Sequence, residues 1–122
     1  MKLFIIIVFF VFPLLAEAET LSGRVVGVSD GDTITVLDAD LQQHKIRLSG
    51  IDAPEKKQPF GQRSKEHLSL LVFDKPVDVE WNKLDRYKRT IGKVMVADPS
   101  CAKTNCPKTV DAGLSQITVG LA

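Results

Sequence analysis

Hydrophobic and polar residues alternate with a period of two in the part of the chain that follows residue 20. In GRVVGVSDGDTITV this alternation predicts a strand that ends at Val28, a turn at 29–32 and a second strand directly after it. The Asp-Gly pair in the turn is a strong hairpin signal. HKIRLSG, residues 44–50, alternates in the same way. We therefore expect three consecutive antiparallel strands in the first third of the domain.

The period then changes to that of a helix. Residues 59–73, PFGQRSKEHLSLLVF, place apolar side chains at helical spacing, and the helix is expected to end at 74–76. VDVEW (77–81) and IGKVMVA (91–97) alternate again and predict two more strands. A second helix is predicted from about Val110, with an apolar face made of Val110, Leu114, Ile117 and Leu121. The expected fold is mainly β with helices (α+β): a five-stranded Greek-key barrel with two helices.

The first 18 residues, MKLFIIIVFFVFPLLAEA, have a different character. A lysine, an apolar run and small residues at the end are typical of a secretory signal peptide. The run is short for a membrane span and Pro13 interrupts it, but an uncleaved anchor is the alternative. We expect a domain of residues 19–122 that is exported to the periplasm or out of the cell. After cleavage it is expected to be a monomer without stable membrane association.

Composition limits the classes of site. With 16 basic and 15 acidic residues the formal net charge is +1, so a polyanion site must come from local clustering. The chain has two cysteines, Cys101 and Cys106. Zinc needs about four ligands, and His44 and His67 have no ligand spacing relative to the cysteines. In an exported protein a disulfide is favoured over two free thiols.

Three short segments carry candidate chemistry. SDGDT places Asp32 in the first turn, and RLSGIDAPE (47–55) places an arginine and two carboxylates around a rigid proline. Asp32 and Asp52 could supply oxygen ligands to a hard cation. KLDRYKRTIGK (83–93) surrounds the single tyrosine with basic residues, which suits phosphate contact and base stacking. Taken singly, SDGDT is better explained as an ordinary hairpin turn, and a solvated loop or turn explains each of the other two segments as well as a functional role does.

In combination and in this order, the three segments resemble the staphylococcal nuclease (thermonuclease) family from about Gly23 to Ala122. The resemblance rests on Asp-Gly-Asp-Thr, then Arg-x4-Asp-x-Pro-Glu, then Asp-x-Tyr-x-Arg. It implies a five-stranded OB-fold barrel and a Ca²⁺-dependent phosphodiesterase. Such an enzyme hydrolyses DNA and RNA with little sequence preference and leaves 3'-phosphate ends.

The resemblance also implies roles for individual residues. These are calcium ligands (Asp32, Asp52 and the carbonyl of Ala53), catalytic residues (Arg47, Glu55 and Arg89) and contacts with substrate phosphate (Arg86 and Tyr87). Guanidinium groups suit the arginine roles because they bind two phosphate oxygens at once. The glutamate could accept a proton from the attacking water or only position it. These two roles stay open.

The chain also departs from the family pattern. Lys88 stands where the family often has glycine, so a positive φ there would strain the backbone. The family's tyrosine near the nucleotide and its C-terminal helix have no counterpart before Ala122, so the sequence is either a fragment or a natural truncation. The cysteine loop is an insertion with an expected structural role.

Two further function classes compete with the nuclease. One is an OB-fold module that binds single-stranded nucleic acid without cutting it, and the other is an exported structural domain with surface charges only. The sequence retains all five side chains matched to metal binding and catalysis, which favours the enzyme.

Overall fold

The computed structural model describes residues 2–9 and 18–122. Residue 1 and residues 10–17 lie outside this description, so the signal peptide at 1–18 stays a prediction. The side chains of Leu3 to Phe9 are exposed. No helix within the described ranges is both long and apolar enough to cross a membrane.

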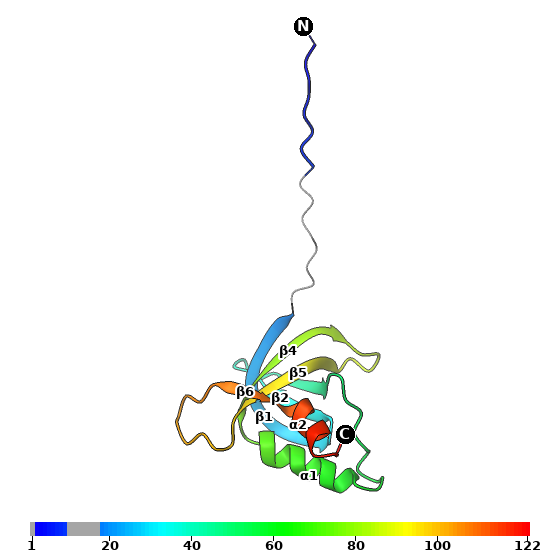
Figure 1. Ribbon diagram of the computed structural model, residues 1–122, viewed down its shortest axis with the longest axis vertical. Helices are drawn as coiled ribbons and strands as arrows, with labels where there is room; N and C mark the ends of the chain where they lie inside the picture. Colours follow the sequence, from blue (N-terminus) through cyan, green and yellow to red (C-terminus); the bar gives the residue numbers. More distant parts are fainter. Residues whose placement is uncertain (1, 10–17) are drawn as a thin grey trace.

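Strands dominate the described domain and two helices accompany them (Figure 1). In chain order the elements are β1 (Glu19–Asp30), β2 (Thr33–Leu37), β3 (Gln43–Leu48), α1 (Gly61–Val72), β4 (Pro76–Leu84), β5 (Thr90–Ala97), β6 (Lys108–Asp111) and α2 (Ala112–Thr118). The five predicted strands and both helices are present, and β6 is a short strand that the sequence pattern did not indicate.

The sheet closes on itself to form a barrel. Its order is β3-β2-β1-β4-β5-β6, and β3 also pairs with β5 in parallel, whereas the other neighbours are antiparallel. Strand β1 has 12 residues, so its first half pairs with β4 and its second half with β2. Register shifts after Val25 and Val28 bend this strand around the barrel. The predicted five-stranded OB-type barrel is thus confirmed.

Alternate residues of the barrel strands point into one core, as their period of two requires. The buried set comprises Val25, Ile34, Val36, Ile46, Leu48, Val77, Val79, Val94 and Val96 from the strands, with Leu68, Leu71 and Val72 from α1. Helix α1 contacts β1 and α2, and α2 contacts β5. Residues between the core positions face outward. Lys45 and Arg47 of β3 are therefore on the outer surface of the barrel.

The prediction for the second helix was wrong in its start and in its buried face. The helix begins at Ala112, because Val110 is in β6 and the Asp111 side chain caps the helix by accepting a hydrogen bond from the Leu114 N–H. Its buried positions are Ala112, Gly113 and Gln116, whereas Leu114 and Ile117 are 58% and 46% exposed. The polar Gln116 is tolerated inside because its amide is fully hydrogen-bonded, as described below.

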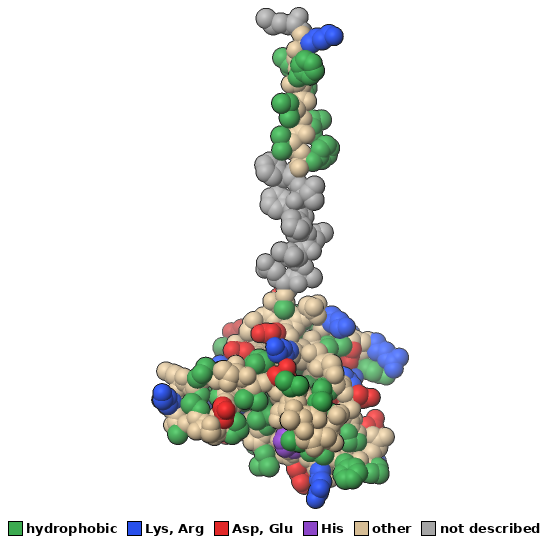
Figure 2. Space-filling model, in the orientation of Figure 1, with side chains coloured by type: hydrophobic (Ala, Val, Ile, Leu, Met, Phe, Trp, Pro, Cys, Tyr) green, Lys and Arg blue, Asp and Glu red, His purple; other side chains and the backbone are tan. Residues whose placement is uncertain are grey.

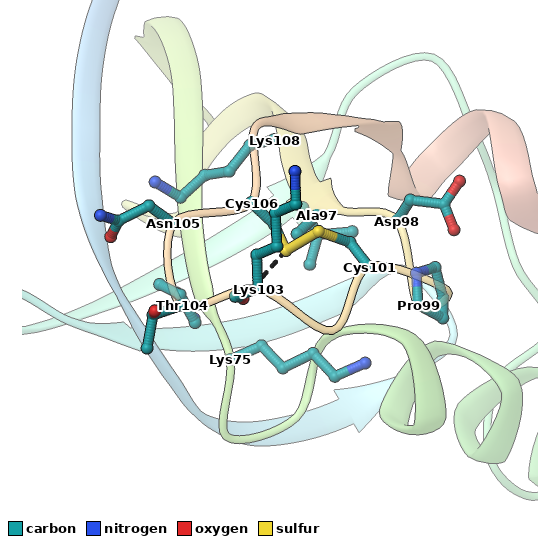
Figure 3. Close-up of a pocket in the computed structure, with 12 residues that line it drawn as sticks. Lys75, Ala97, Asp98, Pro99, Cys101, Lys103, Thr104, Asn105, Cys106 and Lys108 are labelled. Atoms are coloured by element: carbon teal, nitrogen blue, oxygen red, sulfur yellow. Dashed lines mark hydrogen bonds between the residues drawn. A yellow bond between two sulfur atoms is a disulfide. The ribbon is translucent and has the colours of Figure 1, made fainter.

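A disulfide joins Cys101 and Cys106 in the loop between β5 and β6 (Figure 3). The loop and the adjoining strand ends line a cavity of about 590 Å³. Lys75 and Lys108, which line it, point in different directions and are engaged elsewhere, with the Leu70 carbonyl and Asp78 respectively. None of the residues with a predicted catalytic, metal or substrate role lines this cavity.

Candidate active site

Arg47 lies between the two carboxylates that the sequence analysis selected. Its Nη2 is 3.5 Å from Asp32 Oδ2 and 3.4 Å from Asp52 Oδ1. The three residues meet because Thr33 of β2 pairs with Arg47 of β3, which places the residue before β2 beside the strand that leads into Asp52. The side chain of Asp32 is 10% exposed and that of Asp52 is 93% exposed. One carboxylate is thus built into the barrel and the other faces solvent.

Hydrogen bonds fix the buried carboxylate on both sides. The Thr33 hydroxyl donates to Asp32 Oδ1 at 2.9 Å, and the Ala53 N–H donates to Asp32 Oδ2 at 3.1 Å. The Leu48 N–H donates to the Asp32 carbonyl at 2.8 Å. Ala53 is itself buried. The backbone of the segment that carries Asp52 is therefore tied to Asp32 directly.

The turn that carries Asp32 is also held by a residue that had not been predicted to belong to the site. The side-chain amide of Gln116 in α2 donates to the carbonyls of Gly31 and Ser64, each at 2.8 Å, and its Oε1 pairs with His67 Nδ1. Gln116 is fully buried. Gly31 itself packs so close to Ser64 that a Cβ at this position would collide with the serine hydroxyl. The turn that carries Asp32 is thus clamped between the two helices.

A single glutamine on a helix gave no signal from which this role could have been predicted. The apolar residues Leu114 and Ile117 dominated the pattern of α2, and they lie on its exposed side. The clamp becomes visible only when the helix is packed against the turn.

Glu55 follows on the loop between β3 and α1. Its N–H donates to Gln58 Oε1 at 2.7 Å, and its carbonyl accepts from the Gln58 N–H at 2.8 Å. Gly61 packs against the Glu55 carbonyl so closely that a Cβ at Gly61 would collide with it. The Lys56 N–H donates to Asp30 Oδ1, which joins this loop to the first turn. The backbone of Glu55 is held, while its exposed carboxylate makes no hydrogen bond with the described part of the chain.

Arg89 is oriented by an acidic partner in its own hairpin. Its Nε donates to Asp85 Oδ2 at 2.7 Å, and its N–H donates to Asp85 Oδ1 at 2.9 Å. The Tyr87 N–H donates to the same Oδ1. Partial desolvation acts to raise the pKa of Asp85, but the hydrogen bonds from Arg89 and Tyr87 outweigh it, so this pKa is lower than usual. The carboxylate therefore stays ionised and keeps the arginine in place.

Arg86 and Tyr87 are at the exposed end of the same β4–β5 hairpin. The guanidinium carbons of Arg86 and Arg89 lie 4.9 and 5.4 Å from the centre of the Tyr87 ring. The ring is 65% exposed. Basic side chains gather at this end of the hairpin, on the right of Figure 2. An exposed aromatic ring flanked by two cations is suited to contact with a nucleotide.

The parallel pairing of β3 with β5 relates the two catalytic candidates. Ile46 pairs with Thr90 and Arg47 with Ile91, so Arg89, which directly precedes β5, is two residues before the partner of Arg47. Both are assigned to the outward face by strand parity, because their neighbours Ile46, Leu48 and Thr90 are buried. The offset is about 7 Å along the strands. Both guanidinium groups are on one face of the barrel wall.

The predicted calcium ligands fit a hard cation in chemistry. Oxygen atoms from Asp32 and Asp52 both lie within 3.5 Å of one nitrogen of Arg47, so they face the same small volume. Within residues 2–9 and 18–122 there is no group of three or more His, Cys, Asp or Glu side chains that could hold a metal. A cation at this position would therefore rely on the two carboxylates, main-chain carbonyls and water, which suits Ca²⁺ better than a metal that needs nitrogen or sulfur ligands.

Sequence comparison decides the family. Residues 45–119 match the family described as staphylococcal nuclease homologue. The chain belongs to this family. The matched range includes Arg47, Asp52, Glu55 and Arg89, whereas Asp32 precedes it.

Similarity to individual proteins is consistent with the assignment. Protein ParB of Escherichia coli is 44% identical over 94 residues, which are 77% of this chain and 52% of ParB. An uncharacterized endonuclease of Haemophilus influenzae is 52% identical over 71 residues, 58% of this chain and 40% of the relative. A micrococcal nuclease of Shigella flexneri is 47% identical over 72 residues, 59% of this chain and 41% of the relative. The chain thus spans about half the length of these relatives.

Proposed function

We propose that this domain is a Ca²⁺-dependent nuclease that hydrolyses the phosphodiester bonds of DNA and RNA with little sequence preference. The observation that carries the proposal is the contact of Arg47 with both Asp32 and Asp52 on the outer wall of the barrel. This contact brings a guanidinium group, which can bind phosphate, next to two carboxylates, which can bind a cation. Membership of a nuclease family supports the same reaction class.

In the proposed mechanism the arginines bind and stabilise the phosphate. A guanidinium group has five N–H donors, and the contacts of Arg47 with Asp32, Asp52 and the Ile51 carbonyl use only its Nη groups. Arg89 approaches from the neighbouring strand. As water attacks, charge builds on the phosphate oxygens, and two fixed cations stabilise that state more than the ground state.

Asp32, Asp52 and the Ala53 carbonyl would hold the calcium ion. A bound Ca²⁺ supplies charge neutralisation and a site for water beside the phosphate. Glu55 lies three residues beyond Asp52 on a braced backbone with a solvent-facing carboxylate. We assign to it either acceptance of a proton from the attacking water or the positioning of that water. Cleavage is proposed to leave 3'-phosphate ends.

The proposal also covers the cellular location and the oligomeric state of the protein. The segment at 1–18 is proposed to direct export to the periplasm or the cell exterior, and the exported domain is proposed to act as a monomer. The disulfide at Cys101–Cys106 is compatible with an oxidising compartment.

The direct test is hydrolysis of single-stranded DNA and RNA with Ca²⁺ and with a chelator. We expect cleavage only with the cation. In Arg47→Ala and Arg89→Ala we expect the rate of cleavage to fall by about two to three orders of magnitude. Arg24→Ala is the matched control, because Arg24 forms an exposed pair with Asp74 away from this site. Arg47→Lys keeps the positive charge but loses the planar group that binds two phosphate oxygens at once, so its rate of cleavage should remain far below that of the parent.

Two results would contradict the proposal. Near-parental turnover of Arg47→Ala at the same Ca²⁺ concentration would refute the site assignment. Binding of single strands by the parent without Ca²⁺-dependent cleavage would indicate the non-catalytic OB-fold module instead.

A further inference from the structure

A second cavity opens at the end of the barrel next to the candidate active site. Its volume is about 300 Å³ and it is lined by Leu21, Gln43, His44, Lys45, Trp81, Leu84, Lys88 and Thr90. It combines one large aromatic ring and aliphatic side chains with two lysines, and no carboxylate lines it. An apolar cavity with two lysines in its lining suits a nucleobase, which is flat and neutral, together with the phosphate attached to it.

The cavity lies at the start of β3 and β5, close in sequence to Arg47 and Arg89. Lys45 is two residues before Arg47 on the outer side of β3, a distance of about 7 Å. Lys88 directly precedes Arg89 in the β4–β5 hairpin. The step from Arg47 to the cavity edge thus equals about two bases of a strand stacked at 3.4 Å. A strand bound at Arg47 and Arg89 reaches the cavity within a few nucleotides.

Two residues of the lining are held by neighbours. His44 Nε2 is 2.7 Å from Asp38 Oδ2, and that carboxylate also accepts from the Asp40 and Gln42 N–H groups. This arrangement fixes the ring of His44 at the cavity wall. Trp81 packs against the hydrophobic core with part of its surface exposed. These contacts hold His44 and Trp81 at the cavity wall.

Lys88 occupies a backbone conformation that favours glycine. Its φ is +61°, and it closes a tight hairpin in which its N–H donates to the Asp85 carbonyl. A long cationic side chain at a strained backbone position, beside a cavity, points to a use for that side chain.

We propose that this cavity is a subsite for a nucleotide of the single-stranded substrate, located a few residues along the strand from the scissile phosphate. The base stacks against Trp81, and Lys45 and Lys88 bind its phosphate. The proposal rests on the proposed nuclease function, because it assumes that a nucleic-acid strand lies across Arg47 and Arg89. It predicts that affinity rises with oligonucleotide length.

Trp81 is the single tryptophan of the chain, so the tryptophan fluorescence of the protein responds to contacts made by this residue. The test titrates the protein, in chelator so that no cleavage occurs, with the thymidine oligonucleotides (dT)3 and (dT)8. We expect (dT)8 to quench Trp81 fluorescence and to bind at least about tenfold more tightly than (dT)3. Equal affinities, or no change in emission, would overturn the subsite.

Lys88→Gly is the decisive variant because it removes the side chain and relieves the backbone at the same time. Weaker binding then cannot result from a less stable fold, and thermal unfolding of the variant verifies this. We expect the ratio of (dT)3 to (dT)8 dissociation constants to fall at least about threefold, with no change in Lys103→Gly on the remote disulfide loop. An equal effect of both variants would refute the assignment.

The outcomes separate this proposal from the nuclease itself. Length-dependent binding that Lys88→Gly weakens, in a protein that does not cleave with Ca²⁺, would support the subsite and refute the nuclease. Cleavage with Ca²⁺ but without any length dependence would support the nuclease and refute the subsite.

Discussion

Arg89 is held by Asp85 through its side chain and its backbone: Nε donates to Oδ2 at 2.7 Å and the N–H donates to Oδ1 at 2.9 Å. The aspartate belongs to the same hairpin, so the arginine is oriented before any substrate arrives. Such preorganisation lowers the cost of placing a cation on a developing charge.

Asp85→Asn is therefore expected to lower kcat for DNA hydrolysis by about tenfold or more, because the guanidinium loses its fixed orientation. Steady-state kinetics at saturating Ca²⁺ measures the effect. Asp78→Asn is the control, since Asp78 pairs with Lys108 at a distance from the site. Equal losses in the two variants would show that Asp85 has no positioning role.

The same pair predicts an acid-dependent loss of stability. The pKa of Asp85 lies below its usual 3.8 in the folded state, so its hydrogen bonds stabilise the fold above that value and are lost as pH falls through the lowered pKa. Urea unfolding of the parent and of Asp85→Asn between pH 7 and pH 2.5 tests this. We expect the parent's advantage to be constant near neutral pH and to decline toward the acid end. An advantage that persists undiminished at the acid end would contradict the assignment.

Gln116→Leu is expected to reduce the free energy of unfolding by about 2–4 kcal/mol, since it removes a buried amide that donates to the carbonyls of Gly31 and Ser64. Because this clamp supports the turn that carries Asp32, calorimetry should also show weaker Ca²⁺ binding. Leu114→Ala on the exposed side of the same helix should change stability by less than about 0.5 kcal/mol. Similar effects of the two variants would argue against the clamp.

Lys88→Gly is expected to raise the free energy of unfolding by about 1 kcal/mol, because glycine adopts the φ of +61° without strain. Chemical denaturation measures the gain. Lys83→Gly, in a strand of the same hairpin, should instead destabilise the domain, as glycine does in strand interiors. A loss of stability in Lys88→Gly would show that its side chain makes contacts that outweigh the strain.

Removal of the disulfide tests whether the β5–β6 loop matters only for structure. The double variant Cys101→Ser with Cys106→Ser should lose about 2 kcal/mol, the entropy expected for so short a loop. The rate of DNA cleavage at low temperature, where the domain stays folded, should be unchanged. A large loss of activity in the folded variant would connect this loop to the site.

The barrel could be predicted because alternation is local and regular. Ile46 and Leu48, or Val77 and Val79, show their inward parity in the sequence, and all four are buried. The predicted site residues Asp32, Arg47, Asp52 and Ala53 are brought into contact, which three ordered motifs indicated. The family resemblance also indicated that Lys88 would strain the backbone if φ were positive, and φ is +61°.

The sequence by itself thus determined the positions of five strands along the chain, the outward parity of Arg47 and the short motifs that hold the candidate residues, since each depends on neighbours within a few positions. The tertiary structure alone decided the rest. The burial of Gln116 depends on carbonyls from Gly31 and Ser64, which are 85 and 52 residues away. Equally, the cavity beside Trp81 exists only because β3 pairs with β5 when the barrel closes. Hydrogen-bond partners and enclosed space over such separations leave no periodic trace in a single sequence, so folding must bring them together before they can be seen.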